Sequence, residues 1–116
     1  MPTHWSDDIT VCELADEPAL SEELSGLASL LEQRPERASH VVLDFSQVSY
    51  VNSSNLGQLL SLRKLLDARR RIMVLCAVSE QVMSVFRITG LQRVFRVAPD
   101  TLTALAMLQL DDARGS

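Results

Sequence analysis

The fold is decided by residues 41–60, whose sequence is V-V-L-D-F-S-Q-V-S-Y-V-N-S-S-N-L-G-Q-L-L. Residues 41–45 are mostly β-branched, leucine or aromatic, a composition that suits a buried strand. Four short polar side chains follow at residues 52–55, and leucines then recur at helical spacing at positions 56, 59, 60, 62 and 66. Asn52 or Ser53 can accept a hydrogen bond from the free backbone N–H groups of the first helical turn. The stretch therefore predicts a strand, a polar turn and a helix. It also puts a hydroxyl at the positive end of that helix, where an anion is favoured.

The rest of the chain continues the alternation of strand and helix patterns. Apolar β-forming runs predict strands over residues 8–14, 72–78 and 94–97, besides the strand over 40–45. Helical periodicity predicts helices over residues 21–33, 54–69 and 79–90 and a last helix from Pro99-Asp100, while residues 1–7 are expected to fray. Ser79 is expected to cap the third helix, and Gly90 to end it in a left-handed conformation. The mixed faces of the strand over 8–14 suggest a place towards the sheet edge.

This order of elements predicts an α/β fold, with a mixed or parallel sheet of about four strands packed with about four α-helices. No linker, internal repeat or low-complexity segment interrupts the 116 residues. We therefore expect a single domain over residues 1–116, with its core from about 8 to 110. Each helix is expected to bury one face, and the expected inner positions are Leu20, Leu24, Leu27, Leu30 and Leu31; Leu59 and Leu60; Val82, Val85 and Phe86; and Leu102, Leu105, Ala106 and Leu108 or Gln109.

Composition and charge exclude several classes of protein. The net charge of −4 speaks against a nucleic-acid footprint, which needs a clustered basic face. The only basic run, residues 69–71, falls where a helix should end and where cations complement the helix dipole. No apolar run approaches the roughly 20 residues that cross a bilayer, and the amino-terminal residues are too polar for a signal peptide. Cys12 and Cys76 lie in apolar segments and form no C-x-x-C pair, so we expect buried free thiols in a reducing cytoplasm.

The residue patterns of an enzyme are missing. The four glycines are scattered and form neither a P-loop nor a dinucleotide-binding motif. The two histidines, His4 and His40, lie at a loose end and at a strand start, and no nucleophile motif of a serine hydrolase occurs. Adjacent carboxylates such as Glu22-Glu23 are expected to be solvated. We therefore expect no catalytic residue, no metal ion and no cofactor, and we expect Asp44 to cap or brace the turn that leads to Asn52.

Two blocks of the sequence resemble the STAS domain family, which includes the bacterial anti-sigma factor antagonists. Residues 41–57, V-V-L-D-F-S-Q-V-S-Y-V-N-S-S-N-L-G, are similar to the family signature, in which a D-[LF]-S strand end and an apolar pair precede D-S-[ST]-G-L-G at a helix start. Residues 76–95, C-A-V-S-E-Q-V-M-S-V-F-R-I-T-G-L-Q-R-V-F, are similar to the later strand, the helix that ends in T-G-L and the short strand after it. The predicted order of elements fits the rest of the chain.

The resemblance implies a regulator that is not an enzyme. In that family an antagonist binds an anti-sigma factor, often a serine kinase, and phosphorylation of the first serine after the motif aspartate breaks the complex until a phosphatase resets it. By position the acceptor is Ser53, with Ser54 as the fallback, while Asn52 replaces the motif aspartate and Asn55 a motif glycine. The partner surface that the resemblance implies comprises Asn52, Ser53, Ser54, Asn55, Gln58, Ser61 and Lys64, with Asp16 as a second acidic position common in the family.

Three functions remain open at this point. The first is a partner-switching regulator that binds an anti-sigma factor kinase and is controlled by serine phosphorylation. The second is a constitutive binding module or scaffold, in which Asn52 and Asn55 are present because no phosphate is ever placed there. The third is a STAS subunit of a membrane transporter complex. All three are protein-binding roles, and none involves nucleic acid or insertion of this chain into the membrane.

Overall fold

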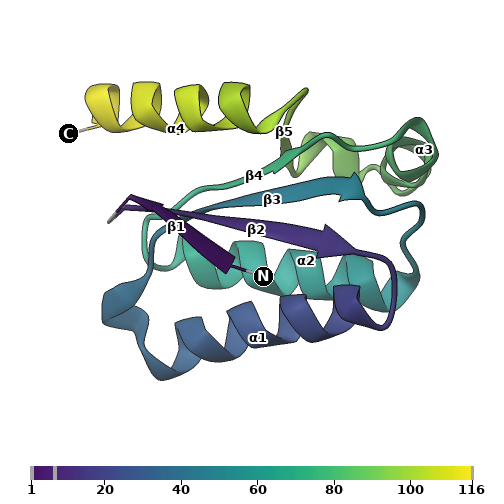
Figure 1. Cartoon of the computed structure of the whole chain (residues 1–116), viewed down its shortest axis with the longest axis horizontal. Helices are drawn as coiled ribbons and strands as arrows, with labels where there is room; N and C mark the ends of the chain where they lie inside the picture. Colours follow the sequence, from purple (N-terminus) through teal and green to yellow (C-terminus); the bar gives the residue numbers. More distant parts are fainter. Residues whose placement is uncertain (1, 7, 116) are drawn as a thin grey trace.

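The computed structural model describes the chain at residues 2–6 and 8–115, with side chains described from Asp8 to Leu110. Strands and helices alternate after an initial pair of strands (Figure 1). The strands are β1 (Pro2–Ser6), β2 (Ile9–Ala15), β3 (His40–Gln47), β4 (Met73–Cys76) and β5 (Arg96–Ala98). The α-helices are α1 (Ala19–Gln33), α2 (Ser53–Asp67), α3 (Glu80–Thr89) and α4 (Thr101–Gly115), and two short 3₁₀ turns, η1 (Pro35–Arg37) and η2 (Leu91–Arg93), connect them.

The strands form one five-stranded sheet in the order β1-β2-β3-β4-β5. Strands β2 to β5 are mutually parallel, which confirms the predicted α/β class, and β1 adds an antiparallel strand beside β2. Two expectations are wrong here. Residues 2–6 form a strand rather than a frayed end, and β2 is consequently not at the edge, because β1 covers its free side. An unpaired edge offers a row of free N–H and C=O groups, which β1 occupies.

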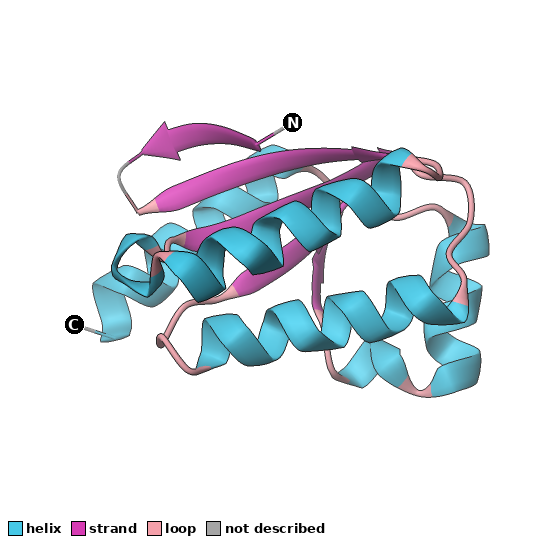
Figure 2. Ribbon diagram, turned by 90° about the horizontal axis from the view of Figure 1, so that it is seen from below, coloured by secondary structure: helices cyan, strands magenta, loops and turns pink. Residues whose placement is uncertain are grey.

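Helices cover both faces of the sheet, but unequally. Helices α1 and α2 run side by side across one face (Figure 2), and α4 lies on the opposite face (Figure 1). The larger core, between the sheet and helices α1 to α3, includes Phe45 and Phe86, whose rings meet edge to face with centroids 6.5 Å apart. The smaller core lies under α4 and includes Val42, Val74 and Leu108. Alternate residues of strands β2 to β5 thus supply both cores.

The structure corrects several predicted helix faces. Leu30 is 47% exposed, Leu60 39% and Leu102 77%, although all three were expected inside, and Ala106 is also exposed. These residues lie next to the buried face of their helix. That face is narrower than the apolar pattern of the sequence suggested, because only one side of each helix packs against the sheet. The predictions are confirmed for Leu20, Leu24, Leu27, Leu31, Leu59, Val82, Phe86, Leu105 and Leu108, while Val85 is half-buried and Gln109 is exposed.

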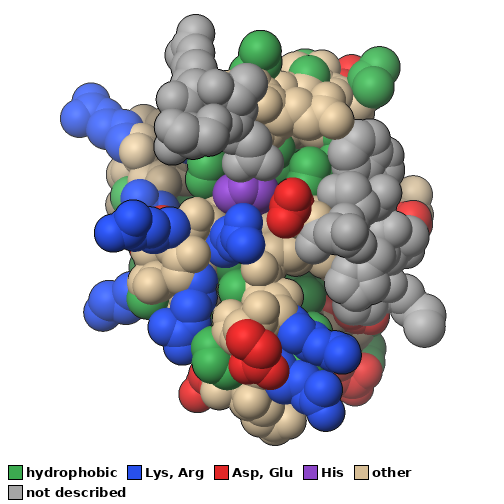
Figure 3. Space-filling model, turned by 90° about the vertical axis from the view of Figure 1, so that its left-hand side faces the viewer, with side chains coloured by type: hydrophobic (Ala, Val, Ile, Leu, Met, Phe, Trp, Pro, Cys, Tyr) green, Lys and Arg blue, Asp and Glu red, His purple; other side chains and the backbone are tan. Residues whose placement is uncertain are grey.

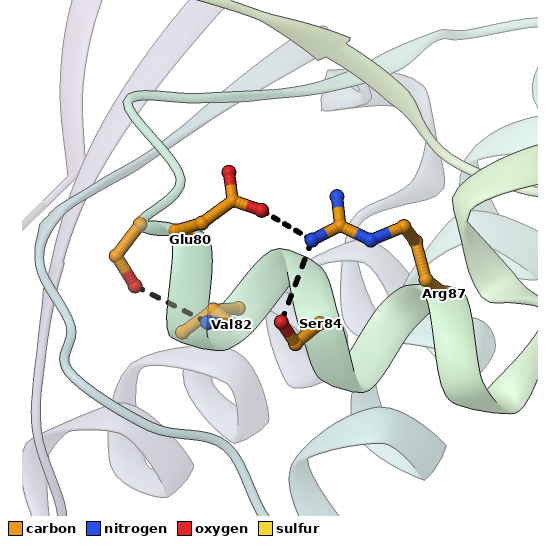
Figure 4. A network of polar contacts seen from close by, with 5 residues as sticks. Glu80, Val82, Ser84 and Arg87 are labelled. Atoms are coloured by element: carbon orange, nitrogen blue, oxygen red, sulfur yellow. Dashed lines mark hydrogen bonds and ion pairs between the residues drawn. The ribbon is translucent and has the colours of Figure 1, made fainter.

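The predicted helix boundaries hold for α3. The Ser79 hydroxyl accepts a hydrogen bond from the Val82 N–H, and Gly90 ends the helix at a φ of 76°, a left-handed conformation that glycine adopts without strain. Figure 4 shows the start of this helix, where Arg87 pairs with Glu80 and reaches Ser84. Cys12 and Cys76 are buried free thiols, as predicted. No helix in the described part of the chain is both long enough and apolar enough to span a membrane.

Candidate functional site at the amino end of helix α2

Two asparagine side chains fix the start of α2. The Asn52 side-chain oxygen accepts a hydrogen bond from the Asn55 N–H at 2.9 Å, and the Asn55 side-chain oxygen accepts one from the Asn52 N–H at 3.0 Å. This reciprocal pair is a capping box, which satisfies backbone donors that the first helical turn would otherwise leave free. Of the two predicted caps, Asn52 is therefore the one that caps the helix, and Ser53 is its first residue.

Ser53 and Ser54 are exposed at this helix start. Neither hydroxyl makes a hydrogen bond with any residue whose side chain the structure describes. Because Asn52 performs the capping, the fold does not need the Ser53 oxygen as an acceptor. The hydroxyl of Ser53 therefore faces solvent at the positive end of a four-turn helix, where added negative charge is stabilised by the helix dipole.

Asn55 is buried rather than available to a partner. Its exposed fraction is 0%, and its side-chain nitrogen lies 3.4 Å from the Ser21 hydroxyl oxygen and 3.4 Å from the Gln58 side-chain oxygen. Gln58 is half-buried, and its nitrogen donates to the Ser21 carbonyl at 3.2 Å and to the Ser25 hydroxyl at 3.0 Å. These contacts tie α2 to α1. We therefore leave Asn55 out of the proposed partner surface, and Gln58 presents only part of its side chain there.

Asp16, at the end of β2, braces the loop that leads into the site. Its carboxylate oxygens accept hydrogen bonds from the Ser49 N–H at 2.8 Å and from the Ser49 hydroxyl at 2.6 Å. The sequence predicted that Asp44 caps or braces this turn, and Asp44 accepts a bond from the Ser46 N–H at 2.9 Å, which is a local cap near the end of β3 rather than a brace across the loop. The loop between β3 and α2 is thus held by a carboxylate that is distant in sequence, and Asp16 lies close to the residues before Ser53.

Glu17 is a second carboxylate at this end of the sheet, and the sequence gave no signal for it. It accepts hydrogen bonds from the Ser21 N–H at 2.6 Å and from the Ser21 hydroxyl at 2.5 Å. Helix α1 has no side-chain bond from its own cap residue, Pro18, so Glu17 satisfies one of its free first-turn donors. Since Ser21 also contacts Asn55, the chain Glu17–Ser21–Asn55 joins the starts of α1 and α2.

The hydrogen bonds at Asp16 and Glu17 stabilise their charged forms. Bonds from the Ser49 hydroxyl and N–H hold the pKa of Asp16 below its usual range, and bonds from the Ser21 hydroxyl and N–H lower the pKa of Glu17. A carboxyl whose pKa is lower in the folded than in the unfolded state stabilises the fold above its unfolded pKa. That stabilisation is lost as the pH falls through the folded pKa.

We accordingly expect a stability loss in acid that depends on these two residues. The wild-type urea midpoint should fall as the pH drops below about 4, the range where unfolded Asp and Glu titrate. The double variant D16N/E17Q keeps acceptor oxygens that do not titrate there, so its midpoint should fall less steeply. Glu22→Gln is the control, because Glu22 is an exposed carboxylate of the same helix start without a hydrogen bond to a described residue. Equal acid sensitivity of D16N/E17Q and wild type would contradict this role.

The outer face of α2 continues from Ser53 with exposed residues. Ser61 and Lys64 are exposed, Leu60 is 39% exposed, and Tyr50 in the preceding loop is 56% exposed. Gly57 lies on the same helix, and a Cβ added to it would meet nothing within 4 Å. Packing inside this chain therefore gives no reason for a glycine at this position. The face combines small and polar side chains with two exposed apolar ones, and of these Tyr50 is of a type enriched in protein interfaces.

Comparisons with known proteins agree with the fold and cover most of the chain. A family model described as the STAS domain matches residues 5–104. A variant of RsbS from Moorella thermoacetica superposes with a TM-score of 0.79 at 21% identity, over 98% of this chain and 97% of that one. An anti-sigma-factor antagonist (STAS) domain protein from Planctomyces limnophilus gives 0.77 at 20% identity, over 94% and 97%. The Bacillus cell fate determinant SpoIIAA in its phosphorylated form gives 0.70 at 19% identity, over 92% and 96%.

Proposed function

This chain belongs to the STAS domain family, and we propose that within it the chain acts as an anti-sigma factor antagonist controlled by phosphorylation of Ser53. It binds an anti-sigma factor that is also a serine kinase, and a phosphatase restores binding after the kinase has acted. The single observation that carries this proposal is the Ser53 hydroxyl, which is exposed at the first position of α2 and outside the capping box.

The placement of Ser53 allows a switch without refolding. A phosphate adds about −1.5 to −2 charges and three acceptor oxygens. Helix α2 tolerates this charge because it enters at the positive end of the helix dipole. The asparagine box that holds the helix start stays intact, since it does not use the serine oxygen. A partner packed over Ser53 would instead have to enclose a solvated dianion, and its affinity falls.

The partner surface that we propose surrounds this hydroxyl. It consists of Asn52, Ser53 and Ser54 at the helix start, Gly57, Ser61 and Lys64 further along α2, and Asp16 and the exposed part of Gln58 beside them. Tyr50 and Leu60 add apolar area to the same face. Tyrosine is among the residues that carry most of the energy in protein interfaces, so Tyr50 is the expected anchor of this surface.

Gly57 gives a prediction in which stability and binding change in opposite directions. Gly57→Ala should raise the free energy of unfolding by up to about 1 kcal/mol, because alanine is the better helix former. It should also weaken partner binding about tenfold, because the added methyl group projects into the closely packed interface. Titration calorimetry and urea unfolding measure the two effects.

Gly26→Ala is the matched control for that variant. Gly26 lies in α1, and a Cβ added there also meets nothing within 4 Å. This substitution should stabilise the fold by a similar amount and leave partner binding unchanged. If both variants bind like the wild type, Gly57 lies outside the interface and the partner surface on α2 is wrongly drawn.

The phosphorylation step is tested with purified proteins. The chain is incubated with ATP and a candidate anti-sigma factor kinase from a neighbouring gene, and the phosphate is mapped by mass spectrometry. We expect a single phosphate on Ser53, none on S53A, and unchanged modification of S54A. Phosphate on Ser54 alone would move the switch by one residue, and no modification of either serine would contradict the proposal.

A constitutive binding module is the second candidate, and the capping box favours it. Asn52 and Asn55 take the positions of a motif aspartate and a motif glycine, and together they close the box with neutral amides. A helix start held in this way needs no charge and no phosphate. In that case Ser53→Asp leaves capture of the partner unchanged in a pull-down, whereas the switch predicts that capture is lost.

A further inference from the structure

Five arginines gather at the end of the molecule opposite Ser53. Arg34 precedes the turn η1 and Arg37 is its last residue, and Arg69, Arg70 and Arg71 lie in the connection between α2 and β4. Figure 3 shows this end of the molecule, where Lys and Arg side chains are prominent. We call these five residues the arginine cluster. Its members are exposed except Arg71, which is half-buried.

Hydrogen bonds hold the two segments of the arginine cluster side by side. Ile72, directly after Arg71, donates its backbone N–H to the Nδ1 of His40 at 2.9 Å. The carbonyl of Ile72 accepts from the Val41 N–H, also at 2.9 Å. His40 begins β3 three residues after Arg37. The cluster is thus placed by the parallel pairing of β3 and β4 rather than by two independent loops.

The charges of the cluster have no pairing partner among the side chains that the structure describes. None of the five guanidinium groups forms an ion pair or a hydrogen bond with a residue whose side chain the structure describes. Asp67, the acid nearest in sequence to residues 69–71, pairs with Arg63 at 3.6 Å instead. Glu32 and Glu36 are the acids closest in sequence to Arg34 and Arg37. The five arginines of the cluster outnumber these two acids.

Arg70 has an unusual backbone conformation in this turn. Its φ is 58°, in the left-handed region where a side chain with a Cβ is strained and glycine is not. Glycine would fit this turn without strain. The planar fork of a guanidinium matches a carboxylate with two parallel hydrogen bonds.

We propose that the arginine cluster is a second docking surface, which binds an acidic segment of a partner protein independently of Ser53. Nucleic acid fits poorly, because the chain as a whole carries a net charge of −4. An anionic membrane surface fits poorly for the same reason, and Ile88, the most exposed large apolar side chain described at 84%, lies on α3 rather than on a segment of the cluster. Clustered carboxylates on a protein match both the charge and the geometry of the guanidinium groups.

The two surfaces are electrostatically separate. Helix α2 has 15 residues and spans the distance between them, which at 1.5 Å per residue is about 22 Å. The screening length at physiological ionic strength is about 8 Å, so charge added at Ser53 is screened before it reaches the arginine cluster. One chain can therefore hold an acidic partner at one end while the other end exchanges its partner.

The test uses a fluorescent peptide of consecutive glutamates and follows its anisotropy with the full chain at low salt. Arg69→Ala combined with Arg70→Gly should weaken binding at least about tenfold, since two charge-assisted contacts are lost. The glycine fits the left-handed turn, so the thermal midpoint should not fall. The matched control, R87A/R93A, removes two positive charges from α3 and η2 and should bind the peptide within about twofold of the wild type. Ser53→Asp should also bind normally.

Four outcomes would overturn the proposal. The first is no binding of the peptide by the wild-type chain, and the second is an equal loss in both double variants, since then only net charge matters. The third is tighter, arginine-dependent binding to phosphatidylglycerol vesicles than to the peptide, which would make a membrane the occupant. The fourth is salt-sensitive self-association that R69A/R70G abolishes, which would make a second copy the occupant.

Discussion

Replacing Leu59 with alanine is expected to lower the free energy of unfolding by about 2–5 kcal/mol, because the leucine fills the core between α2 and the sheet and the variant leaves a cavity. Leu59 is 0% exposed. Leu60, the next residue, is 39% exposed, so Leu60→Ala should cost less than about 1 kcal/mol. Urea unfolding at neutral pH measures the difference in unfolding free energy between the two variants. The slope of that free energy against urea concentration should be equal for both.

The Leu59–Leu60 pair is a matched comparison, because the two substitutions remove the same atoms from adjacent positions of one helix. A similar cost for both would mean that α2 packs on the sheet in a different rotation. The residues around Ser53 would then face a different direction, and the proposed partner surface would have to be redrawn.

Replacing Ser53 with aspartate is expected to weaken binding of the anti-sigma factor by at least about 100-fold, or about 2.7 kcal/mol. The aspartate places a charge where the partner covers the helix start, and enclosing it removes its water. The fold should not suffer, because an acidic side chain in the first helical turn stabilises a helix by about 0.3–1 kcal/mol. Calorimetric titration with the purified partner and a thermal unfolding curve of the variant separate the two effects.

Ser61→Asp is the control for that charge. Ser61 is also an exposed serine of α2, two turns further from the helix start, and the change in net charge is identical. The switch predicts a much smaller loss of affinity for S61D than for S53D. Equal losses would indicate a general electrostatic effect of α2 on binding rather than a switch at Ser53.

Much of the fold could be predicted from the sequence, because its parallel strands and helix ends carry strong local signals. The run from Val41 to Phe45 indicated a buried strand, and Ser79 and Gly90 marked the limits of α3 as the structure has them. β1 could not be predicted, since its short polar sequence pairs with β2 only once β2 offers a free edge. The inner faces of the helices were predicted too broadly, because leucines at adjacent positions such as Leu59 and Leu60 satisfy the periodicity on either side of the true stripe.

Less of the candidate site could be predicted. The sequence indicated a cap at Asn52 or Ser53, and the reciprocal bond from Asn55 is what decides between them. The burial of Asn55 was missed because its polar side chain suggests exposure, while its partner Ser21 is 34 residues away in the chain. The bond between Asp16 and Ser49 likewise spans 33 residues, a contact that no local pattern reveals. Phosphorylation of Ser53 remains a prediction.

The most direct test of the central claim compares one protein in three states: unmodified, phosphorylated on Ser53 alone, and phosphorylated and then treated with a phosphatase. Its affinity for the anti-sigma factor is measured in each state, and circular dichroism monitors the fold. We predict that the unmodified protein binds tightly, that phosphorylation lowers its affinity at least about 100-fold, and that phosphatase treatment restores the full affinity. The helix content should be the same in all three states. Equal affinity in all three states, with phosphate confirmed on Ser53, would contradict the account and leave the chain as a constitutive binding module.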